Sequence, residues 1–105
     1  RPRFSREKFV SAVSLYGKIQ RDATVIEELQ SRNRGNESVN ESDAHYMFDV
    51  ATLGLSKIKS YEAIVDESTR KSIDQTMGGG NMTVPAIKSK FEYIVSVMAL
   101  PSRKD

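Results

Sequence analysis

The chain offers little of the chemistry on which enzymes depend. It contains no Cys, so thiol catalysis, Cys-ligated zinc and disulfide frameworks are excluded. Its single His, His45, would need a nucleophile and an orienting carboxylate within reach to act as a general base, and the nearby Asp43 and Asp49 do not supply that arrangement. One His is also too few for a zinc site without several carboxylates. We therefore expect no enzymatic activity, no metal and no cofactor.

Two short patterns match part of a functional motif but lack the rest of it. Ser5 and Lys8 have the Ser-x-x-Lys spacing of some acyl-transfer enzymes, without the motifs that accompany it there, and Ser5 is better explained as a helix cap. Residues 78–80, all Gly, precede an expected helix as glycines do in phosphate loops. No Lys-Ser/Thr pair follows them, and a helix rather than a strand is expected before them. We interpret this run as a hinge between helices.

The charges are nearly balanced. The 16 basic and 14 acidic residues give a net charge of +2, which is below the basic excess typical of a dedicated nucleic-acid-binding domain. The basic residues still form small groups that a bundle of helices could bring to one face. This candidate basic surface consists of Arg3, Arg6, Arg70, Lys71, Lys88 and Lys90. The alternative is that these charges are scattered and only solubilise the chain.

The candidate residues lie in or beside segments where apolar residues recur at spacings of three and four. This spacing is the period of amphipathic helices. We expect a first helix over residues 6–30 and, after a polar loop over residues 31–42, a second helix from about residue 43 with Asn40 or Ser42 as its cap. Gly17 and Gly54 lie inside these two helices. At Gly17 we expect a close helix crossing or a local bend, and at Gly54 a close approach of another helix.

The carboxyl-terminal half contains more residues that begin or end helices. Residues 66–69 predict a break followed by a short helix over residues 69–77, and one continuous helix over residues 43–77 is the alternative. After the glycines, Thr83 and Pro85 mark the start of a last helix, which Pro101 should end.

These segments predict one all-α domain over residues 1–105, a small antiparallel bundle of three to four helices. Because the chain does not begin with Met, we expect it to be a fragment of a longer protein. No apolar run is long enough to span a membrane, and no hydrophobic signal core is present. We therefore expect an intracellular protein, cytoplasmic or nuclear, and interpret the Asn-x-Ser/Thr sequences at Asn36, Asn40 and Asn81 as loop and capping residues.

The second helix carries the main indication of function. Tyr46, Val50 and Leu53 lie off its principal apolar face, and a bundle of this size is too small to cover them all. Uncovered apolar side chains of this kind are typical of a binding surface. The leading hypothesis is a non-catalytic protein–protein interaction module, which binds a protein partner or another copy of itself. The alternative is a nucleic-acid- or nucleoprotein-associated domain that uses the candidate basic surface.

Overall fold

Four helices make up the described part of the chain. The computed structural model describes residues 5–35 and 38–99, and over these ranges the chain forms helices and no strand. The helices are α1 (Arg6–Arg32), α2 (Glu41–Ile64), α3 (Glu67–Met77) and α4 (Val84–Met98). The predicted all-α class and the small helical bundle are confirmed.

Side-chain caps set where the described helices begin. The Ser5 hydroxyl accepts a hydrogen bond from the backbone N–H of Lys8 (3.2 Å), and the Asn40 side chain accepts one from the N–H of Asp43 (3.1 Å). Thr83 caps α4 in the same way. Each bond satisfies a backbone donor that the first helical turn leaves without a partner. The predicted caps at Ser5 and Thr83 are confirmed, and of the two candidates for α2 the cap is Asn40.

Residues 43–77 form two helices, so the alternative of one continuous helix is wrong. The chain becomes extended at Val65, and the Asp66 carboxylate accepts a hydrogen bond from the N–H of Thr69 (2.9 Å) to start α3. The Arg70 guanidinium donates to the carbonyl oxygens of Glu62 (3.0 Å) and Val65 (2.6 Å) at the end of α2. These bonds satisfy carbonyls that the last helical turn leaves open, and they stabilise the break.

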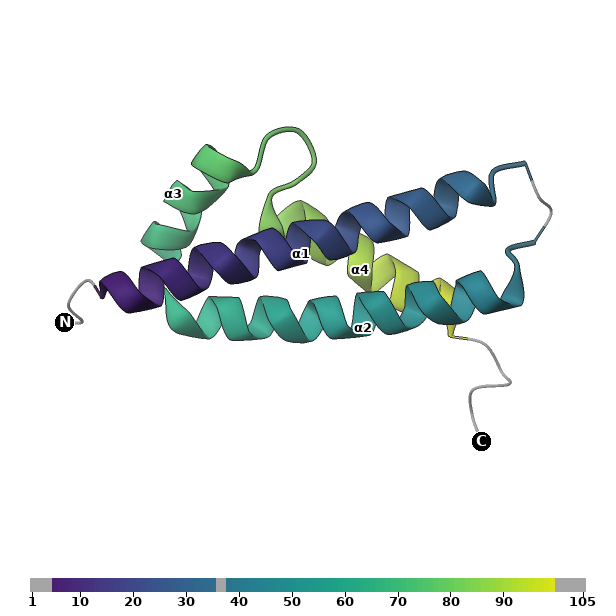
Figure 1. The fold of residues 1–105 in the computed structure, drawn as a ribbon, viewed down its shortest axis with the longest axis horizontal. Coiled ribbons are helices and arrows are strands. Elements are labelled where there is room, and N and C mark those ends of the chain that lie inside the picture. The colour runs from purple at the N-terminus through teal and green to yellow at the C-terminus, as the bar shows by residue number, and fades with distance from the viewer. Residues whose placement is uncertain (1–4, 36–37, 100–105) are drawn as a thin grey trace.

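Helices α1 and α2 run antiparallel side by side, and α4 crosses behind the pair in Figure 1. The molecule measures 51 × 31 × 17 Å, and the short dimension corresponds to two layers of helices. Helix α3 lies toward the amino-terminal end of α1. Within the part of the chain that the structure describes, no helix covers the side of the α1–α2 hairpin that faces the viewer.

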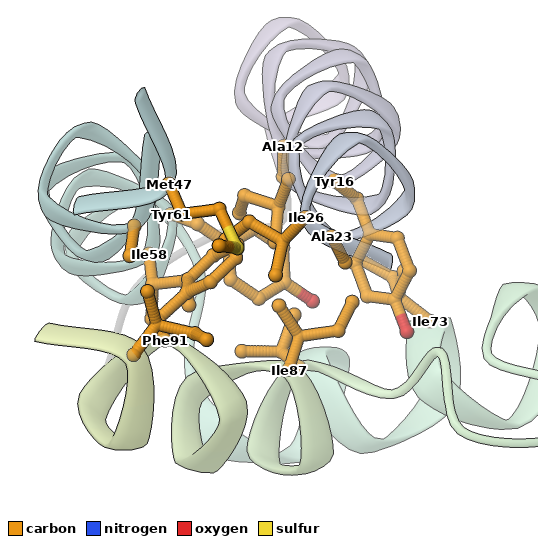
Figure 2. Packing of buried hydrophobic residues seen from close by; sticks show 14 of the residues in the cluster. Ala12, Tyr16, Ala23, Ile26, Met47, Ile58, Tyr61, Ile73, Ile87 and Phe91 are labelled. Atoms are coloured by element: carbon orange, nitrogen blue, oxygen red, sulfur yellow. The ribbon is translucent and has the colours of Figure 1, made fainter. Parts of the chain in front are cut away.

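The core lies between α1, α2 and α4, with one contribution from α3 (Figure 2). The rings of Tyr16 and Tyr61 meet edge to face, with centroids 5.5 Å apart. The largest fully buried side chains are Tyr16, Tyr61, Phe91, Ile19, Ile26, Met47, Ile58, Ile87 and Ile94. From α3 only Ile73 is buried, so this helix depends on polar contacts as well as on packing.

The loop after α3 is tied to α1. Gln20 of α1 donates from Nε2 to the carbonyl oxygens of Met77 (2.9 Å) and Met82 (3.1 Å), one on each side of the glycine run. Gly80 has a φ of 66°, in the left-handed region that favours glycine. The glycines thus permit a sharp turn whose two ends are fastened to the same side chain.

Candidate protein-docking surface

Tyr46, Val50 and Leu53 lie on one side of α2, because they are spaced four and three residues apart on a helix. The exposed fractions of Tyr46 and Leu53 are 52% and 61%. Val50 is half-buried and packs against the core. We call these three residues the seam strip. Within the strip, Val50 contacts the apolar core, and Tyr46 and Leu53 on either side of it are exposed to solvent.

Two ion pairs between α1 and α2 locate the strip. Lys57 Nζ lies 2.7 Å from Asp22 Oδ2, and Arg32 Nη2 lies 2.6 Å from Asp43 Oδ1. Lys57 follows Leu53 by one turn, and Asp43 precedes Tyr46 by about one turn. The strip therefore runs along the seam between the two helices, with a cross-helix ion pair beyond each end.

The hairpin end of the seam is held by a buried asparagine. The side chain of Asn33 donates from Nδ2 to the Leu29 carbonyl and to Asp43 Oδ2 (both 2.8 Å), and its Oδ1 accepts from the N–H of Asn40 (3.0 Å). A buried polar group satisfied on both sides fixes the geometry of the elements that it joins. Asn33 was expected only as part of a solvated loop, and nothing in the sequence distinguishes it from neighbouring polar residues.

The same end of the seam should respond to acid. The Arg32 guanidinium, and then the Asn33 amide, hold the pKa of Asp43 below its usual range by hydrogen bonding to the carboxylate. A lowered folded-state pKa stabilises the fold above the unfolded-state pKa, and this contribution is lost as the pH falls through the folded-state value. We expect Asp43→Asn to be less stable than the wild type at neutral pH, and this difference to shrink below about pH 4.

Urea unfolding of both proteins across this pH range measures that difference. Comparing the two proteins cancels Asp66, whose pKa is also lowered, by its hydrogen bonds from Thr69. A difference that stays constant between neutral and acid pH would contradict the assigned role of the Asp43 charge.

The candidate basic residues are mostly engaged with other groups. Arg3 lies outside the described residues, and Arg6 is exposed at the start of α1. The structure brings Arg70 and Lys88 together at Glu62, since Arg70 donates to its carbonyl and Lys88 Nζ lies 3.8 Å from its carboxylate. The remaining two ion pairs are Lys71 with Glu67 (3.8 Å) and Lys90 with Glu27 (3.2 Å).

His45 lies away from the seam strip, on the outer side of α2. It lines a shallow depression with Asn40, Glu41 and Ser42, and its Nε2 is 4.0 Å from Glu41 Oε2. Over the described ranges there is no cluster of three or more potential metal ligands and no helix both long and apolar enough to cross a membrane.

Other large apolar side chains are exposed elsewhere. Tyr93 and Val97 of α4 have exposed fractions of 61% and 45%, and Val10 of α1 has one of 57%. Tyr93 and Val97 flank a regular apolar stripe, so the sequence pattern does not distinguish them from it. Lys90, one turn before Tyr93 on α4, forms a cross-helix ion pair with Glu27 of α1 (3.2 Å). Tyr93 and Val97 thus have such a pair at one end among the described contacts, whereas the seam strip has one beyond each end.

Comparison of this chain with protein-family models, with curated proteins and with solved structures finds no match.

Proposed function

We propose that this chain is a non-catalytic helical module that binds a helix of a partner protein along the seam strip. The observation that supports the proposal is the exposure of Tyr46 and Leu53 along the seam between α1 and α2. Val50 between them connects this surface to the core. A spacing of four and three residues is also the spacing at which one helix packs against another.

The energetics favour a contact at these side chains. Complete burial of a Leu side chain stabilises by roughly 1.5–3 kcal/mol, so covering the exposed part of Leu53 contributes about 1–2 kcal/mol. Tyr46 adds an aromatic ring, and aromatic residues are frequent among those that dominate binding energy. Two such side chains beside a framed seam support a specific interaction of moderate affinity.

A library of displayed helical peptides, selected against the whole chain, tests the proposal. We expect peptides selected in this way to lose at least about tenfold in affinity for Leu53→Asp, because a charge would replace an apolar contact. Val10→Asp is the matched control, since Val10 is similarly exposed but lies on α1 outside the seam. Both variants should keep the wild-type circular dichroism spectrum. If no selected peptide distinguishes Leu53→Asp from the control, the proposal is wrong.

Binding of nucleic acid stays a prediction without a favouring observation. Lys71, Lys88 and Lys90 each lie beside a carboxylate, and Arg70 is bound to backbone carbonyls. Binding to phosphates would have to compete with these contacts. Titration with single- and double-stranded oligonucleotides at low salt tests the alternative, which would require affinity that falls steeply as salt is added.

A further inference from the structure

The two ion pairs that frame the seam strip are asymmetric in the same sense. In the Arg32–Asp43 pair the side-chain exposures are 65% for the cation and 13% for the carboxylate. In the Lys57–Asp22 pair they are 34% and 16%. The more exposed member is the cation at both ends, so the solvent side of each end presents positive charge.

Both cations retain hydrogen-bonding capacity. The Arg32 guanidinium has five N–H donors, of which Nε and Nη2 bond to Asp43. The Lys57 ammonium has three donors and bonds to Asp22. The Asp43 carboxylate, in contrast, accepts from Asn33 as well as from Arg32 and is turned inward. A second carboxylate approaching from solvent would thus meet donors at both ends of the strip.

The exposed charges next to the strip are of both signs. Lys18 is exposed on α1 one turn before Asp22, on the side that faces the seam. Asp49 is an exposed carboxylate on the outer edge of α2, between Tyr46 and Leu53 in the sequence. Lys18 adds positive charge at the Lys57 end of the strip, whereas at the other end the exposed Arg32 has the exposed Glu28 one turn before it on α1. An acidic group also lies beside the middle of the strip.

We propose that the occupant of the seam strip is an amphipathic partner helix with an apolar centre and a carboxylate near each end. Residues 43 and 57 are 14 positions apart, which corresponds to about 21 Å along a helix. The partner carboxylates should be separated by a similar number of residues. This inference rests on the proposed function and adds the charge pattern of the partner.

Charge complementarity also argues against a second copy of this chain as the occupant. Antiparallel pairing of two seam strips brings Arg32 of one copy toward Lys57 of the other, and parallel pairing brings like residues together. In both arrangements the more exposed cations face each other across the interface, which like-charge repulsion disfavours.

To test this inference, the peptides that the wild-type chain enriches from the helical library are sequenced. Their affinities for the chain are then measured with synthetic peptides. We expect Asp or Glu near both ends of the apolar segment, about 14 positions apart. Replacing each acidic residue by its amide should weaken binding about two- to fivefold, and the loss should be smaller at high salt. Arg32→Gln should remove the effect of the amide replacement at one end, whereas Lys71→Gln, which alters an exposed ion pair on α3, should leave it unchanged.

The outcomes separate this inference from the proposed function. Selected peptides that depend on Leu53 but carry neutral or basic ends would overturn the inference and leave the proposed function standing. Sedimentation that reveals a dimer abolished by Leu53→Asp, without peptide binding, would also overturn it, in favour of a second copy. The absence of any binding that depends on Leu53 would overturn both.

Discussion

Gly54→Ala will lower the free energy of unfolding by about 1–3 kcal/mol, even though Ala is the better helix former. A Cβ atom at this position would lie 2.7 Å from Phe91 Cζ and 2.8 Å from Phe91 Cδ2, well inside van der Waals contact. The Phe91 ring is fully buried, so it has no solvent into which to move. The overlap can be relieved only by separating α2 from α4 or by distorting the ring, and close-packed interiors resist both.

Gly17→Ala is the matched control. Gly17 lies in the middle of α1, and a Cβ atom there would have no neighbour within 4 Å. Replacing Gly by Ala at an open helical position stabilises by about 0.4–1 kcal/mol, because the unfolded chain loses conformational freedom. Urea denaturation of both variants measures the two effects. Equal stability changes of the same sign would contradict the close α2–α4 contact, and Gly54→Ala combined with Phe91→Leu should recover part of the loss.

These two glycines show what the sequence could predict and what it could not. Both lie inside a helix, and the sequence predicts a close helix crossing or a bend at Gly17 and a close approach of another helix at Gly54. The close approach is confirmed at Gly54, whereas Gly17 has no neighbour near enough to require glycine. The difference depends on whether a ring from another helix lies opposite, and local spacing carries no information about that.

Helix positions were more predictable because they depend on neighbouring residues. The caps at Ser5 and Thr83 act over three residues, so a short sequence window contains the whole interaction. The sequence predicts the break between α2 and α3 but keeps one continuous helix as an alternative, because the break also depends on Arg70, which reaches back to carbonyls five and eight residues earlier. Such a contact forms only when the chain has already turned.

The docking surface also has a part that the sequence indicates, the seam strip, and a part that it does not, the framing ion pairs. The seam strip followed from residues too numerous for one helix face, and Tyr46 and Leu53 are exposed as that pattern requires. Its framing ion pairs join residues 11 and 35 positions apart in the sequence. Their pairing depends on the register of α1 against α2, which the Asn33 contacts at the hairpin end help to set. The sequence contains no separate signal for that register.

Helix α3 is attached to the bundle through a partly buried polar contact, and we expect its loss to lower stability. The Tyr16 hydroxyl lies 2.6 Å from Asp74 Oδ1, to which it donates, and the same oxygen accepts from the N–H of Val84 (3.1 Å). Asp74 thus links α1, α3 and the start of α4. Hydrogen bonds to a charged group contribute about 1.5–3 kcal/mol, more than neutral ones do.

Tyr16→Phe should therefore lower the free energy of unfolding by about 1–3 kcal/mol, while Tyr61→Phe should leave it unchanged or raise it by up to about 1 kcal/mol. Both rings are fully buried and touch each other, so Phe preserves the packing at either site. The Tyr61 hydroxyl has no hydrogen-bond partner among the described residues. Urea unfolding at neutral pH compares the two variants, and a Tyr61→Phe loss as large as that of Tyr16→Phe would contradict this difference.

Alkaline pH gives an independent test of the same pair. Burial, and then the nearby Asp74 charge, raise the pKa of Tyr61 to about 12, and burial with the Asp74 hydrogen bond raises the pKa of Tyr16 as well. A raised folded-state pKa means that this stabilisation is fully present below the unfolded-state pKa of about 10 and is lost as the pH rises toward the folded-state value. Each Phe variant removes one of the two ionisable phenols, so its stability should decline less steeply above pH 10 than that of the wild type. Because this effect depends on ionisation and not on the neutral hydrogen bond, Tyr61→Phe should reduce the alkaline decline even if it leaves stability at neutral pH unchanged. An alkaline decline as steep as that of the wild type would mean that Tyr61 ionises as readily in the folded chain as in the unfolded one.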